Sequence, residues 1–109
     1  MAFDPKLADL LRAEVNGHGT LVEKKMFGGL AFMLNGNMVL GTYQAGGMFR
    51  VHKDSTAEAL KIAGTSIMQQ AGHDMPGFIL TSADLVFDKT RRHQLAQMAL
   101  AYVKTLKPK

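Results

Sequence analysis

The amino-acid sequence predicts a single α+β domain over residues 1–109, built in two layers from an antiparallel sheet with helices mainly on one face. Three observations support this prediction. Amphipathic helix patterns lie near both ends of the chain, and apolar runs separated by tight turns lie between them. No repeat or linker divides the 109 residues, a length typical of one domain. Strands joined by tight turns are antiparallel, and terminal helices then cover one face of their sheet.

The first helix is predicted to begin at residue 5. Asp4 is a favourable N-cap, and Pro5 suits the first helical position because its missing N–H has no helical partner there. Gly17 and Gly19 end the helical pattern. The apolar stripe of this helix consists of Leu7, Leu10, Leu11 and Val15.

The central strands are predicted around a hairpin turn at Asn35-Gly36. The apolar runs 30–34 and 37–43 flank these two residues. Asn-Gly is favoured in type I′ turns because both central residues need a positive φ. A further strand is expected at 22–26, ahead of the hairpin.

The hairpin register predicts two apolar sheet faces. A two-residue loop pairs Met33 with Met38, Phe32 with Val39, and Ala31 with Leu40. One face then carries Leu30, Phe32, Leu34 and Val39, and the other carries Ala31, Met33, Met38 and Leu40. Helices in a two-layer fold cover one face only, so the second face needs another partner. We therefore expect a homodimer that uses the face of Met33, Met38 and Leu40 or the sheet edge beside it.

Turn and capping signals predict the segment after the hairpin. Gly46-Gly47 predicts a turn before a strand at 48–52. Ser55 and Glu58 form a capping box that opens a short helix, and Gly64 ends it.

The last third of the chain is predicted to end in a helix. Residues 65–76 show little pattern, Pro76-Gly77 predicts a turn, and 78–80 predict a strand. Asp88 or Thr90 is the expected cap of the final helix. Its apolar stripe consists of Leu95, Met98, Ala99, Tyr102, Val103 and Leu106.

The composition excludes several classes of function. Without cysteine the chain forms no disulfide, thiolate metal site or cysteine nucleophile. No apolar run approaches the roughly 18 residues of a membrane span, and the N-terminus lacks a signal-peptide pattern, so we expect a cytoplasmic protein without membrane contact. The net charge of +4 makes nucleic-acid binding possible. Because the basic residues form separate small groups without a known reading motif, nucleic acid is not the favoured partner.

No catalytic or metal-binding motif is found in the sequence. The four histidines are His18, His52, His73 and His93. None forms a local ligand pair, so we expect no metal and no cofactor. Gly28-Gly29 matches neither glycine-rich phosphate motif and predicts a bulge or turn. Asp84 and Asp88 are expected to favour helix starts, so we name no catalytic residue.

Arg50 is the polar residue that most suggests a binding site. It lies inside an otherwise apolar run, with His52 on the same face by the two-residue period of a strand and Lys53 next to it. A guanidinium can bind a carboxylate or phosphate through paired donors. The alternative is an arginine whose stem packs on the sheet while its head lies in water or meets an acid. Arg50, His52 and Lys53 are thus candidates for ligand or partner binding.

Five segments form a recognisable combination. They are Lys24–Met33 (Lys-Lys-Met-Phe-Gly-Gly-Leu-Ala-Phe-Met), Asn35–Met38, Met48–Val51, Pro76–Phe78 and Ala99–Leu106. This combination resembles the TfoX N-terminal domain family over residues 4–107. The resemblance implies an α-β-α fold and a stand-alone member of a family named after a regulator of competence for DNA uptake. The family supplies no established catalytic residues.

Together these observations favour a non-enzymatic regulatory or protein-interaction domain. Its expected partners are a second copy of the chain and an unidentified protein. Two alternatives stay open: a weak nucleic-acid-binding module that uses the scattered basic groups, and a small-ligand binder or enzyme with a site near Arg50.

Overall fold

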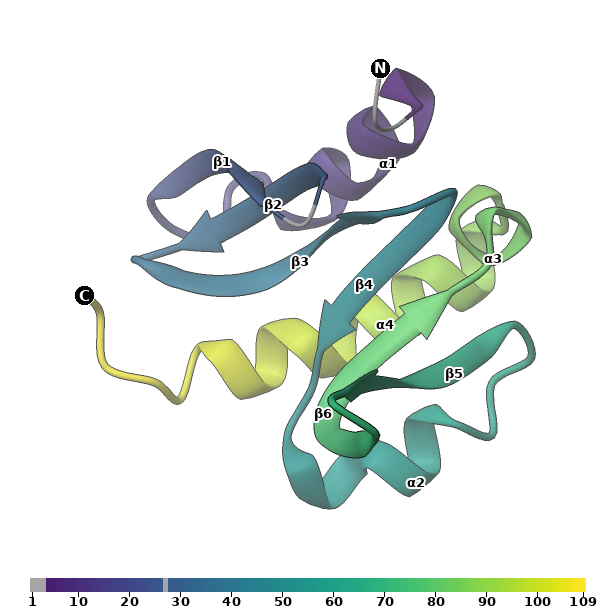
Figure 1. The fold of residues 1–109 in the computed structure, drawn as a ribbon. Coiled ribbons are helices and arrows are strands. Elements are labelled where there is room, and N and C mark those ends of the chain that lie inside the picture. Colours follow the sequence, from purple (N-terminus) through teal and green to yellow (C-terminus); the bar gives the residue numbers. More distant parts are fainter. Residues whose placement is uncertain (1–3, 27) are drawn as a thin grey trace.

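The computed structural model describes residues 4–26 and 28–109. Phe27, which belongs to the Lys24–Met33 segment, and residues 1–3 lie outside the described part. The elements in chain order are α1 (Pro5–Val15), β1 (Leu21–Met26), β2 (Gly29–Leu34), β3 (Asn37–Tyr43), β4 (Gly46–Arg50), the 3-10 helix η1 (Lys53–Ser55), α2 (Thr56–Ala59), β5 (Thr65–Gln70), β6 (His73–Thr81), α3 (Ala83–Phe87) and α4 (Lys89–Val103) (Figure 1).

Six strands form one sheet in the order β1-β2-β3-β4-β6-β5, and every neighbouring pair is antiparallel. Figure 1 shows α1, α3 and α4 behind this sheet, on the face turned away from the viewer. The predicted α+β class, with helices mainly on one face, is therefore confirmed.

The two long helices begin where their caps predict. The Asp4 carboxylate accepts a hydrogen bond from the Lys6 backbone N–H at 2.9 Å, directly before Pro5. The Asp88 carboxylate accepts from the backbone N–H groups of Thr90 and Arg91 at the start of α4. The pKa of Asp88 is lowered, first by a side-chain hydrogen bond from Arg91 and then by the backbone bond. Asp88, rather than Thr90, is thus the cap of the final helix.

The Asn35-Gly36 hairpin forms as predicted, but its register shifts after the first pair. Asn35 has a φ of 52° and Gly36 a φ of 86°, as a type I′ turn requires. Met33 pairs with Met38, which confirms that prediction. A bulge between Phe32 and Met33 then leaves one extra residue on β3.

The bulge corrects the predicted pairing beyond Met33. Phe32 pairs with Leu40 instead of Val39, and Ala31 pairs with Gly41 instead of Leu40. Leu40 therefore lies on the helix side with Phe32, and its assignment to the face of Met33 and Met38 was wrong. The pairing suits Gly41, because a Cβ there would lie 2.6 Å from the Leu30 carbonyl oxygen.

The turn predicted at Gly46-Gly47 lies two residues earlier. Tyr43 pairs with Gly46 across the β3–β4 hairpin, so Gln44 and Ala45 form the loop, and Gln44 has a φ of 52°. Both glycines belong to β4. A Cβ at Gly46 would collide with the Thr81 backbone of β6, so glycine permits a close strand approach here rather than a turn.

Two further local predictions need correction. Ser55 makes no side-chain capping bond, and η1 is capped by His52 instead. Pro76-Gly77 is not a turn: both residues lie inside β6, where Gly77 has a φ of 87° and bends the strand. The hairpin turn lies at Ala71-Gly72, between β6 and the unpredicted strand β5.

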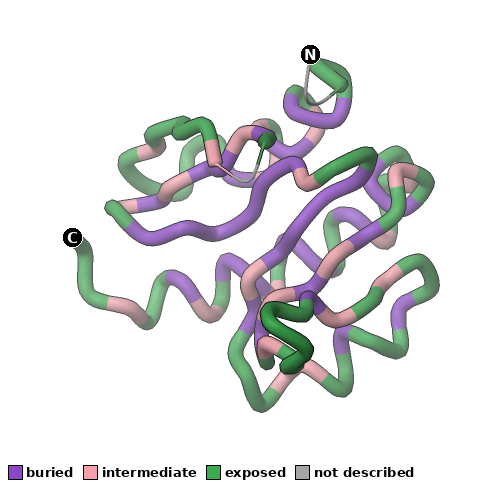
Figure 2. The backbone as a smooth tube through the Cα atoms, viewed as in Figure 1, coloured by how far each residue is buried: buried purple, intermediate pink, exposed green. Residues whose placement is uncertain are grey.

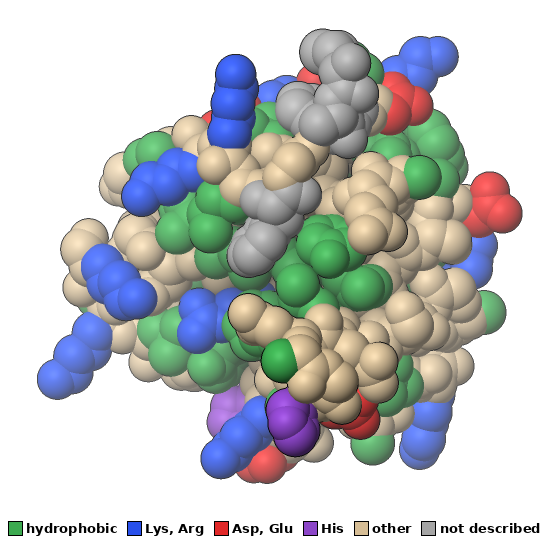
Figure 3. All heavy atoms as spheres, viewed as in Figure 1, with side chains coloured by type: hydrophobic (Ala, Val, Ile, Leu, Met, Phe, Trp, Pro, Cys, Tyr) green, Lys and Arg blue, Asp and Glu red, His purple; other side chains and the backbone are tan. Residues whose placement is uncertain are grey.

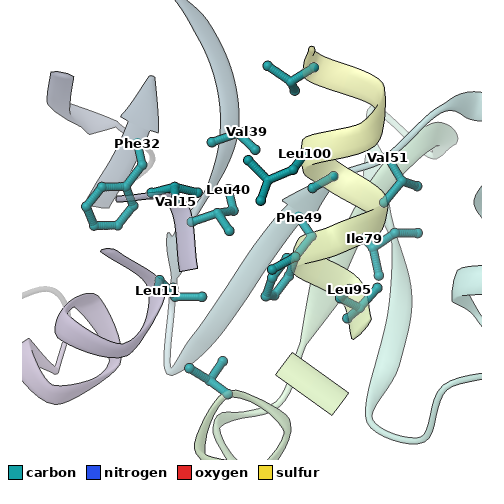
Figure 4. Close-up of a cluster of buried hydrophobic side chains, with 14 of the residues drawn as sticks. Leu11, Val15, Phe32, Val39, Leu40, Phe49, Val51, Ile79, Leu95 and Leu100 are labelled. Carbon is teal, nitrogen blue, oxygen red and sulfur yellow. The ribbon is translucent and has the colours of Figure 1, made fainter. Parts of the chain in front are cut away.

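Buried residues run along the central strands and the helices (Figure 2), and their hydrophobic side chains form two separate clusters. The helix-side core joins α1, α2, α3 and α4 to the sheet and includes Leu11, Phe32, Leu40, Phe49 and Leu95, all at 0% exposure (Figure 4). On the opposite face lies a second group, here named the methionine cluster. Its buried members are Ala31, Met38, Met48 and Met68, and Met26, Met33, Tyr43, Met75, Phe78 and Leu80 pack against them.

Candidate functional site

Arg50 is the last residue of β4 and lies where the pairing between β3 and β4 has ended. Strands β3 and β4 pair only between Tyr43–Gly46 and Leu40–Phe49, so the ladder stops one residue before Arg50. On the other side of β4, Arg50 remains paired with Phe78 of β6. Arg50 therefore has a paired strand on its β6 side and none on its β3 side.

A pocket of about 340 Å³ occupies this opening. We call it the Arg50 pocket. It is lined by Arg50, Val51, His52, Lys53, Pro76, Phe78 and Tyr102. The structure thus brings together the three predicted site residues, using the end of β4, the start of η1, the bend in β6 and the last turn of α4.

Two aromatic rings hold the Arg50 guanidinium. Its central carbon lies 5.4 Å from the Tyr102 ring centroid and 5.9 Å from that of Phe78. Each such contact is worth about 0.5–1 kcal/mol at an exposed site. The half-buried guanidinium forms no hydrogen bond or ion pair with any residue in the ranges 4–26 and 28–109. Its position is thus set by rings, and its polar edge is left available.

His52 has an orientation set by the backbone. Its Nδ1 accepts a hydrogen bond from the Asp54 backbone N–H at 3.0 Å, so the neutral ring carries its proton on Nε2. Its ring also meets Tyr102 edge-on, with 5.3 Å between centroids. Because β4 ends at Arg50, His52 reaches the pocket as a helix cap and not through strand periodicity.

Lys53 completes the basic character of the pocket. Among the described residues its ammonium has no hydrogen bond or ion pair. The Asp54 carboxylate lies 3.6 Å from Nδ1 of His52 and is 80% exposed, and it does not line the pocket. Two permanent cations and one imidazole therefore line this space without a lining carboxylate.

Sequence reasoning missed Phe78 and Tyr102 as parts of this site. Both were assigned to apolar elements, and they lie 28 and 52 positions from Arg50 in the chain. An arginine flanked by apolar residues was the available signal, since guanidinium groups often stack on aromatic rings. The particular rings follow only from the β4–β6 register and the path of α4.

The predicted self-association face is largely buried by its own chain. Met38 is 9% exposed, Met33 is half-buried, and the corrected register places Leu40 in the helix-side core. Figure 3 views this side of the molecule and shows hydrophobic side chains near its centre, with Lys and Arg side chains mostly toward the margin. Met33 and Met38 thus contribute to the methionine cluster, while self-association itself stays a prediction.

Part of the positive charge is used inside the fold. Nε of Arg91 donates to the Asp88 carboxylate at 2.7 Å, and its Nη1 donates to the Ala63 carbonyl. Nε of Arg92, 8% exposed as a residue, donates to the Glu14 carboxylate at 2.9 Å and so joins α4 to α1. These two arginines are therefore structural, which removes them from the basic groups considered for nucleic acid.

The part of the chain that the structure describes offers neither a metal site nor a helix for a membrane. No group of three or more His, Cys, Asp or Glu side chains there could hold a metal ion. None of the helices there is long and apolar enough to cross a membrane.

The fold and the Arg50 pocket define a small α+β domain with a basic, aromatic-lined site. The sequence profile of the TfoX N-terminal domain matches residues 13–103, which includes every element from β1 to α4. The chain belongs to the TfoX N-terminal domain family. This is not a known enzymatic family. A comparison with curated proteins found no match.

Proposed function

We propose that this chain is a non-enzymatic regulatory domain that works through protein association at the β5 edge of its sheet. The observation that carries this proposal is the composition of β5. All six residues, Thr65-Ser66-Ile67-Met68-Gln69-Gln70, are uncharged. β5 ends the strand order, so its outer backbone groups have no strand partner among the described residues. Such an edge is a template for another strand.

The opposite edge of the sheet has the reverse character. β1 exposes Glu23, Lys24 and Lys25 in succession. Charged side chains, lysine above all, are a common protection of edge strands against pairing with another chain. The difference between the two edges supports β5 as the surface for association.

An open groove of about 480 Å³ adjoins the start of β5. Ser66 belongs both to the edge strand and to the groove, whose other walls include Leu80 and the loop Gln44-Ala45. A strand added beside β5 would gain backbone hydrogen bonds, and a long side chain from it would have this groove within reach.

The partner to which we commit is a second copy of the chain. Two β5 strands related by a twofold axis would pair antiparallel, and an uncharged strand opposite itself brings no like charges together. Since Ala31 and Met38 are buried within one chain, the edge is a better contact than the face of Met33 and Met38.

Light scattering on a size-exclusion column tests this proposal. The mass measured for the wild-type chain should be twice that of one chain. The double variant Ser66→Lys with Gln70→Lys should be a monomer. In the antiparallel β5 pair each ammonium introduced at Ser66 would face the ammonium introduced at Gln70 of the other copy, and these like charges repel. Val22→Lys, at the 47% exposed Val22 of β1, is the matched control and should stay dimeric.

Three results would contradict the proposal. A wild-type monomer at high micromolar concentration would exclude the second copy. A dimer that survives both β5 substitutions would exclude the edge. A dimer broken by Met33→Lys and not by the β5 pair would move the contact to the methionine face.

A further inference from the structure

We propose that the Arg50 pocket binds the phosphate group of a small organic phosphate monoester. This inference rests on the pocket alone and is independent of the self-association at β5. Its starting point is Arg50, a half-buried residue whose guanidinium lacks a carboxylate partner within the described ranges. A guanidinium without an acidic partner keeps its donors for water or for a bound anion.

The two aromatic contacts explain how Arg50 stays in place without an acid. Rings stack on the faces of a guanidinium, whereas its N–H donors point outward in its own plane. The guanidinium carbon lies 5.4 Å and 5.9 Å from the Tyr102 and Phe78 ring centroids, and its N–H donors meet no hydrogen-bond acceptor among the described residues, so these donors remain for a ligand. A planar donor fork held in this way is suited to binding an oxyanion through two parallel hydrogen bonds.

The neighbouring donors favour phosphate over carboxylate. His52 and Lys53 line the same pocket as Arg50, and these two residue types carry an imidazole N–H and an ammonium group as further donors. A phosphate monoester presents three acceptor oxygens and a charge of about −1.5 to −2 at neutral pH. This matches three donor groups and two permanent positive charges, whereas a carboxylate offers two oxygens and one charge.

The size and walls of the pocket limit the rest of the ligand. A volume of about 340 Å³ is at the lower end of the range for ligand pockets. Pro76 and the free part of Phe78 provide apolar surface for a single sugar or ring next to the phosphate. The ligand class is therefore a compact organic phosphate, such as a sugar phosphate or an aryl phosphate.

The structural alternative is that Arg50 only packs against its two rings. Arg50→Lys separates the two cases because it keeps a cation and an alkyl stem but loses the donor fork. Lys53→Ala removes the second cation from the exposed start of η1. Lys61→Ala is the matched control, because Lys61 is an exposed lysine that does not line the pocket.

The experiment is a titration of the full chain with phenyl phosphate, ribose 5-phosphate and benzoate, followed by amide chemical shifts and by calorimetry. We expect both phosphates to bind, to shift the amide signals of residues 50–53 and 76–78, and to exceed benzoate in affinity. Arg50→Lys should weaken binding by at least about tenfold, as expected for a central arginine anchor. Lys53→Ala should weaken it less, and Lys61→Ala should bind like the wild type.

A phosphoserine peptide forms the second arm, since a phosphorylated protein would present the same chemical group. Binding of ribose 5-phosphate in preference to the peptide supports a small-molecule ligand. If the phosphoserine peptide binds and ribose 5-phosphate does not, the ligand is a phosphorylated protein and the proposal of a small organic phosphate is wrong. The whole proposal fails if neither phosphate binds at millimolar concentration, if benzoate binds equally well, or if Arg50→Lys, with an unchanged folded spectrum, retains wild-type affinity.

Discussion

The two faces of the sheet are both apolar, yet they are built from different side chains and covered in different ways. The helix-side core is rich in Leu, Val and Phe, and residues of α1, α2, α3 and α4 pack into it. The methionine cluster is smaller, comes from strands alone in the described residues, and has several half-buried members. Branched and aromatic side chains define one tight packing, whereas methionine adapts to irregular space. The comparison indicates a rigid face that specifies the fold and a more adaptable face beside the proposed binding surfaces.

The way in which the second face is closed explains the difference. The β5–β6 hairpin contributes Met68, Met75 and Phe78, and its strands carry a bulge between Ile67 and Gln69 and the bend at Gly77. Bulges increase the local twist and bend of a strand. The sheet therefore curls over its own second face, and helices are not needed to bury Met48.

The largest loss of stability is expected from a cavity in the helix-side core, and it tests whether the two faces differ in packing. Phe49→Ala should lower the free energy of unfolding by about 3–5 kcal/mol, because the 0% exposed ring is fixed between the sheet and its helices. Urea denaturation followed by far-ultraviolet circular dichroism measures the loss. A loss below that caused by Met48→Ala, the matching change in the methionine cluster, would show that the two faces do not differ in this way.

The matching change on the other face should cost less. Met48→Ala should lower the free energy of unfolding by about 2 kcal/mol, the lower end for such changes, because neighbouring methionines can fill part of the space. Met48→Leu should cost less than about 1.5 kcal/mol. The same urea experiment gives both values, and equal losses for Phe49→Ala and Met48→Ala would count against an adaptable methionine face.

The smallest expected change in stability concerns an ion pair between α1 and β1, at the margin of the helix-side core. The guanidinium carbon of Arg12 in α1 lies over the Phe32 ring, 5.5 Å from its centroid, and the guanidinium donates to the Glu23 carboxylate at 2.7 Å and 2.9 Å. The hydrogen bond from Arg12 is the main cause that lowers the pKa of Glu23 from 4.5, and partial burial opposes it. A carboxylate with a lowered pKa stabilises the fold above its unfolded pKa, and the stabilisation is lost as the pH falls.

The wild type should therefore lose stability below about pH 4.5, and Glu23→Gln should lose less over the same range. Because both side chains are more than a third exposed, the difference should stay below about 1 kcal/mol. Thermal unfolding at pH 7 and pH 3 measures it for both proteins. An identical acid sensitivity would show that this pair adds nothing to stability.

Local signals predicted a large part of the fold. Asp4 and Asp88 cap the long helices because a short carboxylate reaches free N–H groups nearby in the chain. Asn35-Gly36 turns the hairpin because these two residues tolerate positive φ. Strand β5 escaped prediction because Thr65–Gln70 is an exposed edge strand with only Met68 fully buried, so its apolar alternation is weak.

The sequence by itself determined the α+β class, the caps of the two long helices and the Asn35-Gly36 turn, since caps and turns depend on contacts a few positions apart, and it named Arg50 as a candidate site residue. Only the tertiary structure decided that Leu40 joins the helix side, that Gly46 serves a close strand approach, and that Phe78 and Tyr102 hold Arg50. A single bulge reverses the face of every residue beyond it, and the strand register decides which distant rings meet. These outcomes depend on packing between segments far apart in the chain, which no local pattern contains.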